Sequence, residues 1–193
     1  MTRIVLASRS PQRLALLEGI GLEVEVIESG VEERTDGDPL ELVEANALEK
    51  ARTVAARPEA SDAIVAGGDT EVVLEGTVLG QPQDAEDARR MLSALSGREH
   101  EVLGGLCLVF PEEGEPRLGV EASRVRFRSL DEALIDAYVE GGEWRGRAGG
   151  YAIQGAGSCL VERVEGDLSN VIGLPLSLLA RLAPELLRST RQN

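Results

Sequence analysis

Residues 63–70 read Ala-Ile-Val-Ala-Gly-Gly-Asp-Thr, and the architecture is best worked out from this segment toward both ends. Its four apolar residues predict a short buried strand, and the Gly67-Gly68 pair predicts that the strand ends there. Because open α/β folds bind ligands at the carboxyl ends of their strands, Asp69 is a candidate to bind a hard cation or to accept a proton from water. An aspartate that only caps the backbone of a turn is an equally good interpretation.

The segments on either side alternate between short apolar strands and capped helices. The expected strands cover residues 3–7, 22–27, 72–74, 77–79, 101–110, 118–127 and 159–164, with a hairpin at Glu75-Gly76. The expected helices cover residues 11–21, 38–57, 84–97, 129–140 and 174–187, with caps at Ser10, Asp38, Asp84 and Ser129 and a break at Pro184. This mixture predicts an α/β fold, with a mixed twisted sheet and flanking helices, in one domain over residues 1–193.

The composition excludes several classes of protein. The chain of 193 residues is 42% hydrophobic and 28% charged, which is typical of a soluble globular protein. It has no apolar run of 18 residues that would span a membrane and no N-terminal stretch that resembles a secretory signal. Its two cysteines cannot build a disulfide framework or a four-cysteine zinc site, so we expect a protein of the reducing cytoplasm.

The charge balance bears on the partners. The formal net charge of −14 argues against nonspecific binding to nucleic acid or to an anionic membrane. A polyanionic substrate would need a local pocket with basic groups or a metal. Of the 20 basic residues, 19 are arginines and one is Lys50. Since lysine is a point charge and arginine a planar fork, the single lysine indicates either a site that requires it or a chance survivor.

Ser8-Arg9-Ser10-Pro11-Gln12-Arg13 is a candidate phosphate-binding turn. A strand-to-helix turn presents free backbone N–H groups and the positive end of the helix, to which Ser8, Ser10 and Arg13 add donors. An ordinary Ser-Pro helix cap is the alternative. In the same way, Glu32-Glu33 and Lys50 could hold a metal-bound phosphate or could be solvated surface charge.

The glycine-rich segment 147–155 is the last candidate. Its glycines permit close approach of the backbone to a ligand, and Gln154 offers a donor and an acceptor suited to the edge of a base, although a flexible turn is the alternative. His100, the only histidine, is expected in a strand, and Cys107 is expected in the core.

Together these segments resemble the Maf family of nucleoside triphosphate pyrophosphatases over nearly the whole chain. The blocks that carry the resemblance are Leu6-Ala-Ser-Arg-Ser-Pro-Gln-Arg13, Glu32-Glu33, Glu49-Lys-Ala51, Gly68-Asp-Thr70, Leu79-Gly-Gln-Pro82 with Met91-Leu92 and Leu95-Ser-Gly97, Ala148-Gly-Gly-Tyr-Ala-Ile-Gln-Gly155 and Val171-Ile-Gly-Leu-Pro175. The resemblance implies an elongated, two-lobed fold with a central cleft, shared with the inosine triphosphate pyrophosphatases, and a homodimer.

The resemblance also implies a reaction, in which water attacks the α-phosphate of a nucleotide and releases pyrophosphate with the help of Mg²⁺ or Mn²⁺. Asp69 matches the catalytic carboxylate, and Glu33 with Asp69 matches the metal-binding pair. Thr70 and Gln154 match the positions that determine base choice in the branch acting on dTTP and UTP. The positions that match the phosphate site are Ser8, Ser10, Arg13, Lys50 and Gln81.

Two positions depart from that branch. Gln12 stands where an arginine is usual, and Gln81 stands where a lysine is usual, so base choice and rate are both open. The leading expectation is a pyrophosphatase for dTTP and UTP or for modified pyrimidine nucleotides, which prevents their incorporation into nucleic acids. The alternatives are a pyrophosphatase for a purine or modified nucleotide, and a weakly catalytic nucleotide-binding regulator of cell division.

Overall fold

The computed structural model describes residues 3–189, which form one seven-stranded sheet with helices on both faces. The strands are β1 (Ile4–Leu6), β2 (Val24–Val26), β3 (Ile64–Leu74), β4 (Thr77–Val78), β5 (Glu99–Val109), β6 (Arg117–Phe127) and β7 (Val161–Glu165). The α-helices are α1 (Pro11–Gly19), α2 (Pro39–Ala55), α3 (Ala85–Leu95), α4 (Glu132–Gly141), α5 (Leu168–Ile172), α6 (Leu176–Leu182) and α7 (Pro184–Ser189). Short 3₁₀ turns are η1 (Pro58–Ala60), η2 (Ala148–Gly150) and η3 (Gly155–Cys159).

The sheet is mixed, as expected. Its order is β2-β1-β3-β5-β6-β7, with β4 paired to β3. β1 is parallel to β2 and β3, whereas the pairs β3–β4, β3–β5, β5–β6 and β6–β7 are antiparallel. None of the helices formed by residues 3–189 is long and apolar enough to cross a membrane.

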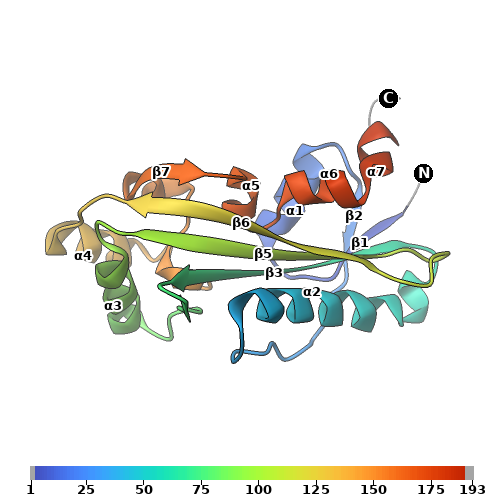
Figure 1. Ribbon diagram of the computed structural model, residues 1–193, viewed down its shortest axis with the longest axis horizontal. Helices are drawn as coiled ribbons and strands as arrows, with labels where there is room; N and C mark the ends of the chain where they lie inside the picture. The colour runs from blue at the N-terminus through green and yellow to red at the C-terminus, as the bar shows by residue number, and fades with distance from the viewer. Residues whose placement is uncertain (1–2, 190–193) are drawn as a thin grey trace.

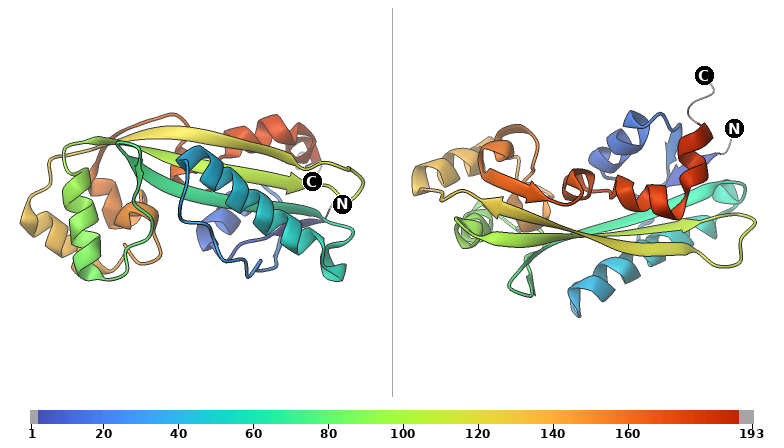
Figure 2. Two further views of the ribbon diagram at one scale, coloured as in Figure 1. Left: turned by 60° about the horizontal axis from the view of Figure 1, so that its bottom comes forward. Right: turned by 45° about the horizontal axis from the view of Figure 1, so that its top comes forward.

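Three long strands give the molecule its elongated shape (Figure 1). β3, β5 and β6 have 11 residues each, so each spans about 36 Å. At one end they carry β1, β2, α1, α6 and α7, which we call the first lobe, and at the other end α3, α4, η2 and η3, which we call the second lobe. α2 covers the opposite face of the sheet from α6 (Figure 2).

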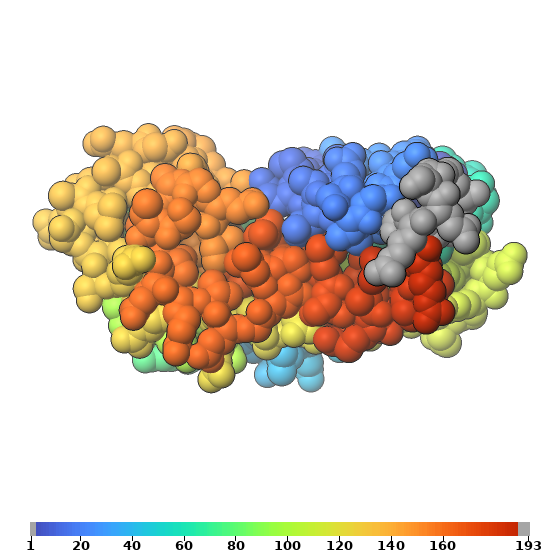
Figure 3. All heavy atoms as spheres, turned by 90° about the horizontal axis from the view of Figure 1, so that it is seen from above, coloured from blue at the N-terminus to red at the C-terminus, as the bar shows by residue number. Residues whose placement is uncertain are grey.

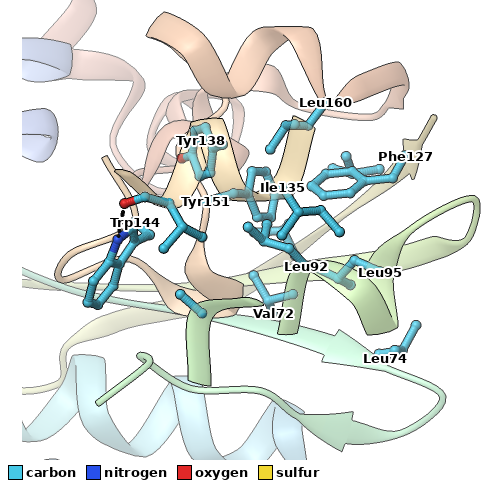
Figure 4. Packing of buried hydrophobic residues seen from close by; sticks show 14 residues of the cluster. Val72, Leu74, Leu92, Leu95, Phe127, Ile135, Tyr138, Trp144, Tyr151 and Leu160 are labelled. Carbon is cyan, nitrogen blue, oxygen red and sulfur yellow. Dashed lines mark hydrogen bonds between the residues drawn. The ribbon is translucent and has the colours of Figure 1, made fainter. Parts of the chain in front are cut away.

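Each lobe has its own apolar core. In the first lobe, Leu6 of β1 and Leu17 of α1 pack with Leu179 of α6. In the second lobe, the rings of Phe127 and Tyr151 pack edge to face with centroids 4.8 Å apart, in one cluster with Ile135 of α4 (Figure 4). The two cores fix the lobes at opposite ends of the long strands.

Local sequence signals set several boundaries correctly. Ser10 caps α1 by accepting a hydrogen bond from the backbone N–H of Arg13, and Asp38 caps α2 in the same manner. Glu75 and Gly76 form the predicted hairpin turn with φ angles of 50° and 80°. The last helix is interrupted before Pro184, as expected, because proline cannot continue the hydrogen-bond ladder.

One predicted boundary is wrong at the centre of the fold. Gly67-Gly68 does not end a strand, since β3 runs unbroken from Ile64 to Leu74. The glycine is required by packing instead. A Cβ atom on Gly67 would lie 2.4 Å from the carbonyl oxygen of Ala47 in α2, and one on Gly105 of β5 would lie 2.2 Å from that of Val43. The backbone of α2 therefore rests directly on the sheet.

The cap predicted for α4 is also wrong. Asp131 accepts the hydrogen bond from the backbone N–H of Leu134, so the cap lies two residues after Ser129, the cap that the spacing to Glu132 suggested. Asp131 is as good a cap as serine, and it is followed at once by helical residues. α5 was not expected, because five residues are too few to show helical periodicity.

One edge of β3 is open between the lobes. β1 pairs with β3 only as far as Ala66, and the β4 side of the hairpin begins again at Val72. Within the described chain, no strand pairs with this edge in between. In the space-filling view a notch separates the N-terminal segment from the segment around residues 140–155 (Figure 3). Asp69 lies in the open interval, so the central cleft is formed where the sheet lacks a strand.

The contact between α2 and the sheet yields a stability prediction. Gly67→Ala is expected to lower the free energy of unfolding by at least about 2–3 kcal/mol, because the methyl group meets backbone that cannot turn aside. Urea unfolding followed by circular dichroism measures the change. Gly141→Ala in α4 is the matched control, since no atom lies within 4 Å of its Cβ, and it should be neutral or slightly stabilising. Equal stability of Gly67→Ala and the wild type would contradict the close contact.

Candidate active site

The turn between β1 and α1 is tied to the middle of β3. Ser8 Oγ accepts hydrogen bonds from the backbone N–H of Ser10 (3.2 Å) and from Arg13 Nη1 (3.0 Å). Arg13 also donates through Nη2 to Thr70 Oγ1 (3.2 Å) and through Nε to the carbonyl of Gly173 (2.9 Å). Burial lowers the pKa of Arg13, while three nearby carboxylates, led by Asp69, act in the opposite direction. Arg13 thus joins the predicted phosphate-binding turn to Thr70 of β3.

Lys50 is buried in α2, and its side chain reaches Asp69 of β3. Only 4% of the residue is exposed. Its Nζ lies 2.6 Å from Glu33 Oε1 and 2.8 Å from Asp69 Oδ1, and it also donates to the carbonyl of Gly68 at 3.4 Å. The three donors of the ammonium group therefore have three acceptors. The sequence-predicted residues Glu33, Lys50 and Asp69 are brought together, whereas Glu32 is exposed and lies outside both cavities described below.

Asn46 is a site residue that the sequence analysis missed. It is fully buried one helical turn before Lys50. Its Nδ2 donates to Asp69 Oδ2 (3.0 Å) and to the carbonyl of Arg34 (3.1 Å), and its Oδ1 accepts from the backbone N–H of Arg34 (2.9 Å). Asn46 therefore holds both Asp69 and the loop that carries Glu33. A signal was present, because an asparagine in the apolar stripe of a helix needs a buried partner.

Glu71 is the second missed residue. It follows Asp69 by two positions, so both side chains project from the same face of β3. Its Oε2 is buried and has no hydrogen-bond partner among residues 3–189. Burial, helped by the charges of Asp69 and Glu33, raises the pKa of Glu71 to about 7. Glu71 was missed because the predicted strand ended at Gly67-Gly68. In a turn, unlike in a strand, side chains two residues apart are not expected on the same face.

Two cavities meet at the side chains of Glu33, Lys50 and Asp69. The first, of about 690 Å³, extends along the edge of β3 into the second lobe and is lined by Thr70, Val72, Tyr151, Ile153 and Gln154 among others. The second, of about 630 Å³, covers the β1–α1 turn and is lined by Ser8, Ser10, Lys50 and Arg145 among others. The first combines apolar walls with amide groups, which suits a flat polar ring, and the second is rich in cationic and N–H donors, which suit phosphates.

The three glutamines singled out from the sequence lie at two places in this space. Gln12 lines both cavities, and its Oε1 accepts a hydrogen bond from Ser10 Oγ at 3.2 Å. Gln81 is exposed and also lines both cavities. Gln154 is exposed and lines only the first cavity. Gln154 is therefore separated from the cationic cavity, whereas Gln12 and Gln81 lie at the junction.

The only histidine has no part in this chemistry. His100 is buried in β5, as expected of a strand residue, and its Nε2 lies 2.8 Å from the hydroxyl of Tyr151. Burial lowers the pKa of His100 to about 4, so its ring is neutral near pH 7. His100 lines neither cavity, and Cys107 is fully buried in the core, as expected.

The donor set fits a divalent cation only if a ligand completes the coordination. Within the described chain, no three His, Cys, Asp or Glu side chains are grouped closely enough to hold a metal by themselves. Both oxygens of Asp69 already accept hydrogen bonds, while Glu71 has a buried oxygen without a partner. Mg²⁺ is commonly held by one or two carboxylates together with phosphate oxygens of a substrate. One or two of the carboxylates Glu33, Asp69 and Glu71 fit that arrangement.

The chain is similar to known proteins over nearly its whole length. The family described as "Maf-like protein" matches residues 3–186. The dTTP/UTP pyrophosphatase of Dictyoglomus thermophilum is 41% identical over 191 residues, covering 95% of this chain and 98% of that protein. The dTTP/UTP pyrophosphatase of Anaeromyxobacter dehalogenans is 48% identical over 187 residues, covering 93% of this chain and 92% of that protein.

A solved structure supports the fold. The HAM1 protein of Coxiella burnetii superimposes with a TM-score of 0.52 at 16% identity, covering 98% of this chain and 96% of that one. At this identity the likeness concerns the arrangement of the sheet and helices alone. It agrees with the expected elongated α/β architecture.

The buried Glu71 yields a prediction of pH dependence. The folded state holds the Glu71 proton up to about pH 7, whereas the unfolded chain loses it near 4.5. Protonation therefore favours folding, and this contribution to stability declines as the pH rises through that window. Glu71→Gln should remove the decline, so that the variant gains roughly 1–3 kcal/mol over the wild type between pH 5 and pH 8.

Urea unfolding at both pH values, with EDTA present, measures this difference. Glu101→Gln, at an exposed position of β5, is the control and should follow the wild-type profile. Parallel pH profiles of Glu71→Gln and the wild type would mean that Glu71 is solvated and ionised throughout.

Proposed function

The chain belongs to the Maf family, and on that premise we propose that it hydrolyses nucleoside triphosphates, with dTTP and UTP as substrates, to a nucleoside monophosphate and pyrophosphate. The observation that carries the proposal is the buried Lys50–Asp69 ion pair at the meeting point of two cavities that differ in chemistry. The names of the relatives in Dictyoglomus and Anaeromyxobacter support the choice of nucleotide.

The substrate is proposed to lie with its base and sugar in the first cavity and its phosphates in the second. Gln154 and Thr70 then face the base side, where amide and hydroxyl groups can read a pyrimidine edge. Gln12 lies at the junction and contributes a neutral amide. The phosphates meet Ser8, Ser10 and the free N–H groups at the start of α1.

The proposed reaction needs a water molecule at the α-phosphorus. Asp69 accepts one hydrogen bond on each carboxylate oxygen, so lone pairs remain to accept a proton from that water. As the new P–O bond forms, the bond between the α-phosphorus and the bridging oxygen breaks, and pyrophosphate leaves with both electrons of that bond. Lys50 and Asn46 keep the Asp69 carboxylate in one orientation throughout.

We propose Mg²⁺ or Mn²⁺ as the cofactor, held by one or two of the carboxylates Glu33, Asp69 and Glu71 together with substrate phosphates. When bound, such a cation neutralises charge on the phosphate oxygens and favours departure of pyrophosphate. Glu71 is the carboxylate whose buried oxygen is free to bind it. A homodimeric and cytoplasmic form is proposed from the family resemblance alone, and light scattering of the purified protein measures the first of these.

A panel of triphosphates tests the function directly. Each nucleotide is incubated with the protein and Mg²⁺ or Mn²⁺, and nucleoside monophosphate and pyrophosphate are both quantified. We expect equal amounts of nucleoside monophosphate and pyrophosphate from dTTP and from UTP. Purine nucleotides should give smaller amounts of both products. Release of inorganic phosphate and a nucleoside diphosphate would contradict attack at the α-phosphate. Preference for a purine nucleotide would contradict the base assignment, and negligible turnover of every nucleotide would favour a regulator.

Asp69→Asn is expected to reduce kcat by a factor of about 10²–10⁴, because an amide cannot accept the proton from water. The fold should persist, since Asn has nearly the shape of Asp and Lys50 keeps Glu33 as a charged partner. Single-turnover kinetics with dTTP measures the loss, and the thermal midpoint checks folding. A variant that keeps more than a tenth of the wild-type kcat would exclude Asp69 as the base.

Lys50→Arg is expected to lower kcat/KM for dTTP by about 10–100-fold although the charge is kept. A planar guanidinium is larger than the ammonium group and cannot donate to three converging acceptors in the same space. The matched control is Arg52→Lys, the reverse exchange at an exposed position of α2, which should leave kcat/KM unchanged. Wild-type kinetics in Lys50→Arg would show that the single lysine is not required.

A further inference from the structure

Two arginines line both cavities, and they come from opposite lobes. Arg13 belongs to α1 in the first lobe, and Arg147 immediately precedes η2 in the second lobe. A molecule that occupied both cavities would lie close to both side chains. Arg145, by contrast, lines only the second cavity, is exposed and places its guanidinium over the Trp144 ring.

The backbone of Arg147 is held firmly by the core of the second lobe. Its N–H donates to the carbonyl of Trp144 (3.1 Å), and its own carbonyl accepts from Gly150 (3.0 Å). Trp144 is buried, and its indole Nε1 donates to the carbonyl of Val139 in α4 (2.9 Å, Figure 4). The backbone of Arg147 is therefore fixed at the cavity junction before any ligand binds.

The Nε atom of Arg147 has no hydrogen-bond acceptor among the described residues, whereas the Nε atom of Arg13 has one. Arg13 donates from Nε, Nη1 and Nη2 to protein acceptors. Arg147 is half-buried, and its Nε is buried without a hydrogen-bond partner among residues 3–189. A buried N–H group without an acceptor is unfavourable, and the unmet donor here belongs to a permanent cation. An anion at the junction would satisfy it.

The hairpin next to Arg147 carries a neutral side chain at the same junction. The carbonyl of Gly80 accepts a hydrogen bond from the N–H of Gly149 (2.7 Å), which joins the two segments. Gly149 has a φ of 67°, and a Cβ atom there would lie 2.9 Å from Val72, so the join requires glycine. Gln81 follows Gly80 and also lines both cavities, but it adds no charge.

We propose that Arg147 binds the phosphate chain of the substrate from the second lobe, opposite Arg13 and beside the neutral Gln81. The inference rests on the proposed function, since it takes a nucleoside triphosphate as the ligand. A phosphate chain held in this way links the two lobes across the open edge of β3. Arg147 is a substrate-binding residue in this assignment, and its effect is on phosphate affinity.

The test measures binding of inorganic pyrophosphate, with Mg²⁺ present, by titration calorimetry, and kcat and KM for dTTP. Arg147→Gln should weaken pyrophosphate binding and raise KM by about 10–100-fold, the usual effect of losing a hydrogen bond to a charged group. The loss should be smaller at high salt, because screening weakens the charge that is removed. Arg128→Gln, an exposed arginine of the second lobe that lines neither cavity, should bind pyrophosphate as the wild type does.

The deciding variant is the double substitution Arg147→Gln with Gln81→Lys. If the junction needs one cation, lysine at position 81 should restore at least half of the lost affinity on a logarithmic scale. Loss without recovery would overturn the proposal, because a merely structural effect at position 147 is not repaired by a charge at position 81. Unchanged affinity in Arg147→Gln, in a protein whose wild type cleaves dTTP, would overturn it while leaving the proposed function intact. A wild type that neither binds pyrophosphate nor cleaves any triphosphate would overturn both.

Discussion

The ammonium group of Lys50 holds together a helix, a strand and a loop that are distant in the sequence. It can reach Asp69 because α2 lies directly on the sheet at Gly67, where no side chain separates helix from strand. Burying a charged group costs free energy because the group loses its water. This cost is offset only when each N–H of the Lys50 ammonium group donates to an acceptor. Removing one partner of such a pair commonly costs about 3–5 kcal/mol. Packing at Gly67 and charge at Asp69 are therefore parts of one constraint, and the cleft is built around both.

The fold could be predicted where short-range chemistry decides it. Ser10 and Asp38 cap their helices, and Glu75-Gly76 turns the hairpin, because each signal involves groups only a few residues apart. Gly67-Gly68 was misread for the opposite reason. A glycine that ends a strand and a glycine that admits a helix backbone look alike in sequence, and only the position of α2 separates them.

The candidate site follows the same division. Glu33, Lys50 and Asp69 were found from the sequence, through the scarcity of lysine, the loop position of the acid and the family resemblance. Asn46 and Glu71 were missed, because their importance comes from Asp69, which they contact or adjoin only in the folded chain. Once β3 is known to be continuous, the two-residue spacing places Glu71 beside Asp69 without further information.

The electrostatic balance of the cleft explains why substrate phosphates need more than the first lobe can offer. The body of the protein carries a formal charge of −14, but screening at physiological ionic strength limits its reach to about 8 Å, so the lining residues decide. The charged residues of the two linings are the carboxylates Glu28, Glu33, Asp69, Glu71 and Glu143 and the cations Arg9, Arg13, Arg34, Lys50, Arg145 and Arg147. Because the charge of Lys50 is already shared by two carboxylates, it attracts phosphate weakly. A polyanion would therefore gain most from the proposed metal cation at Glu71 and from Arg147 of the second lobe, because both would contact the same ligand.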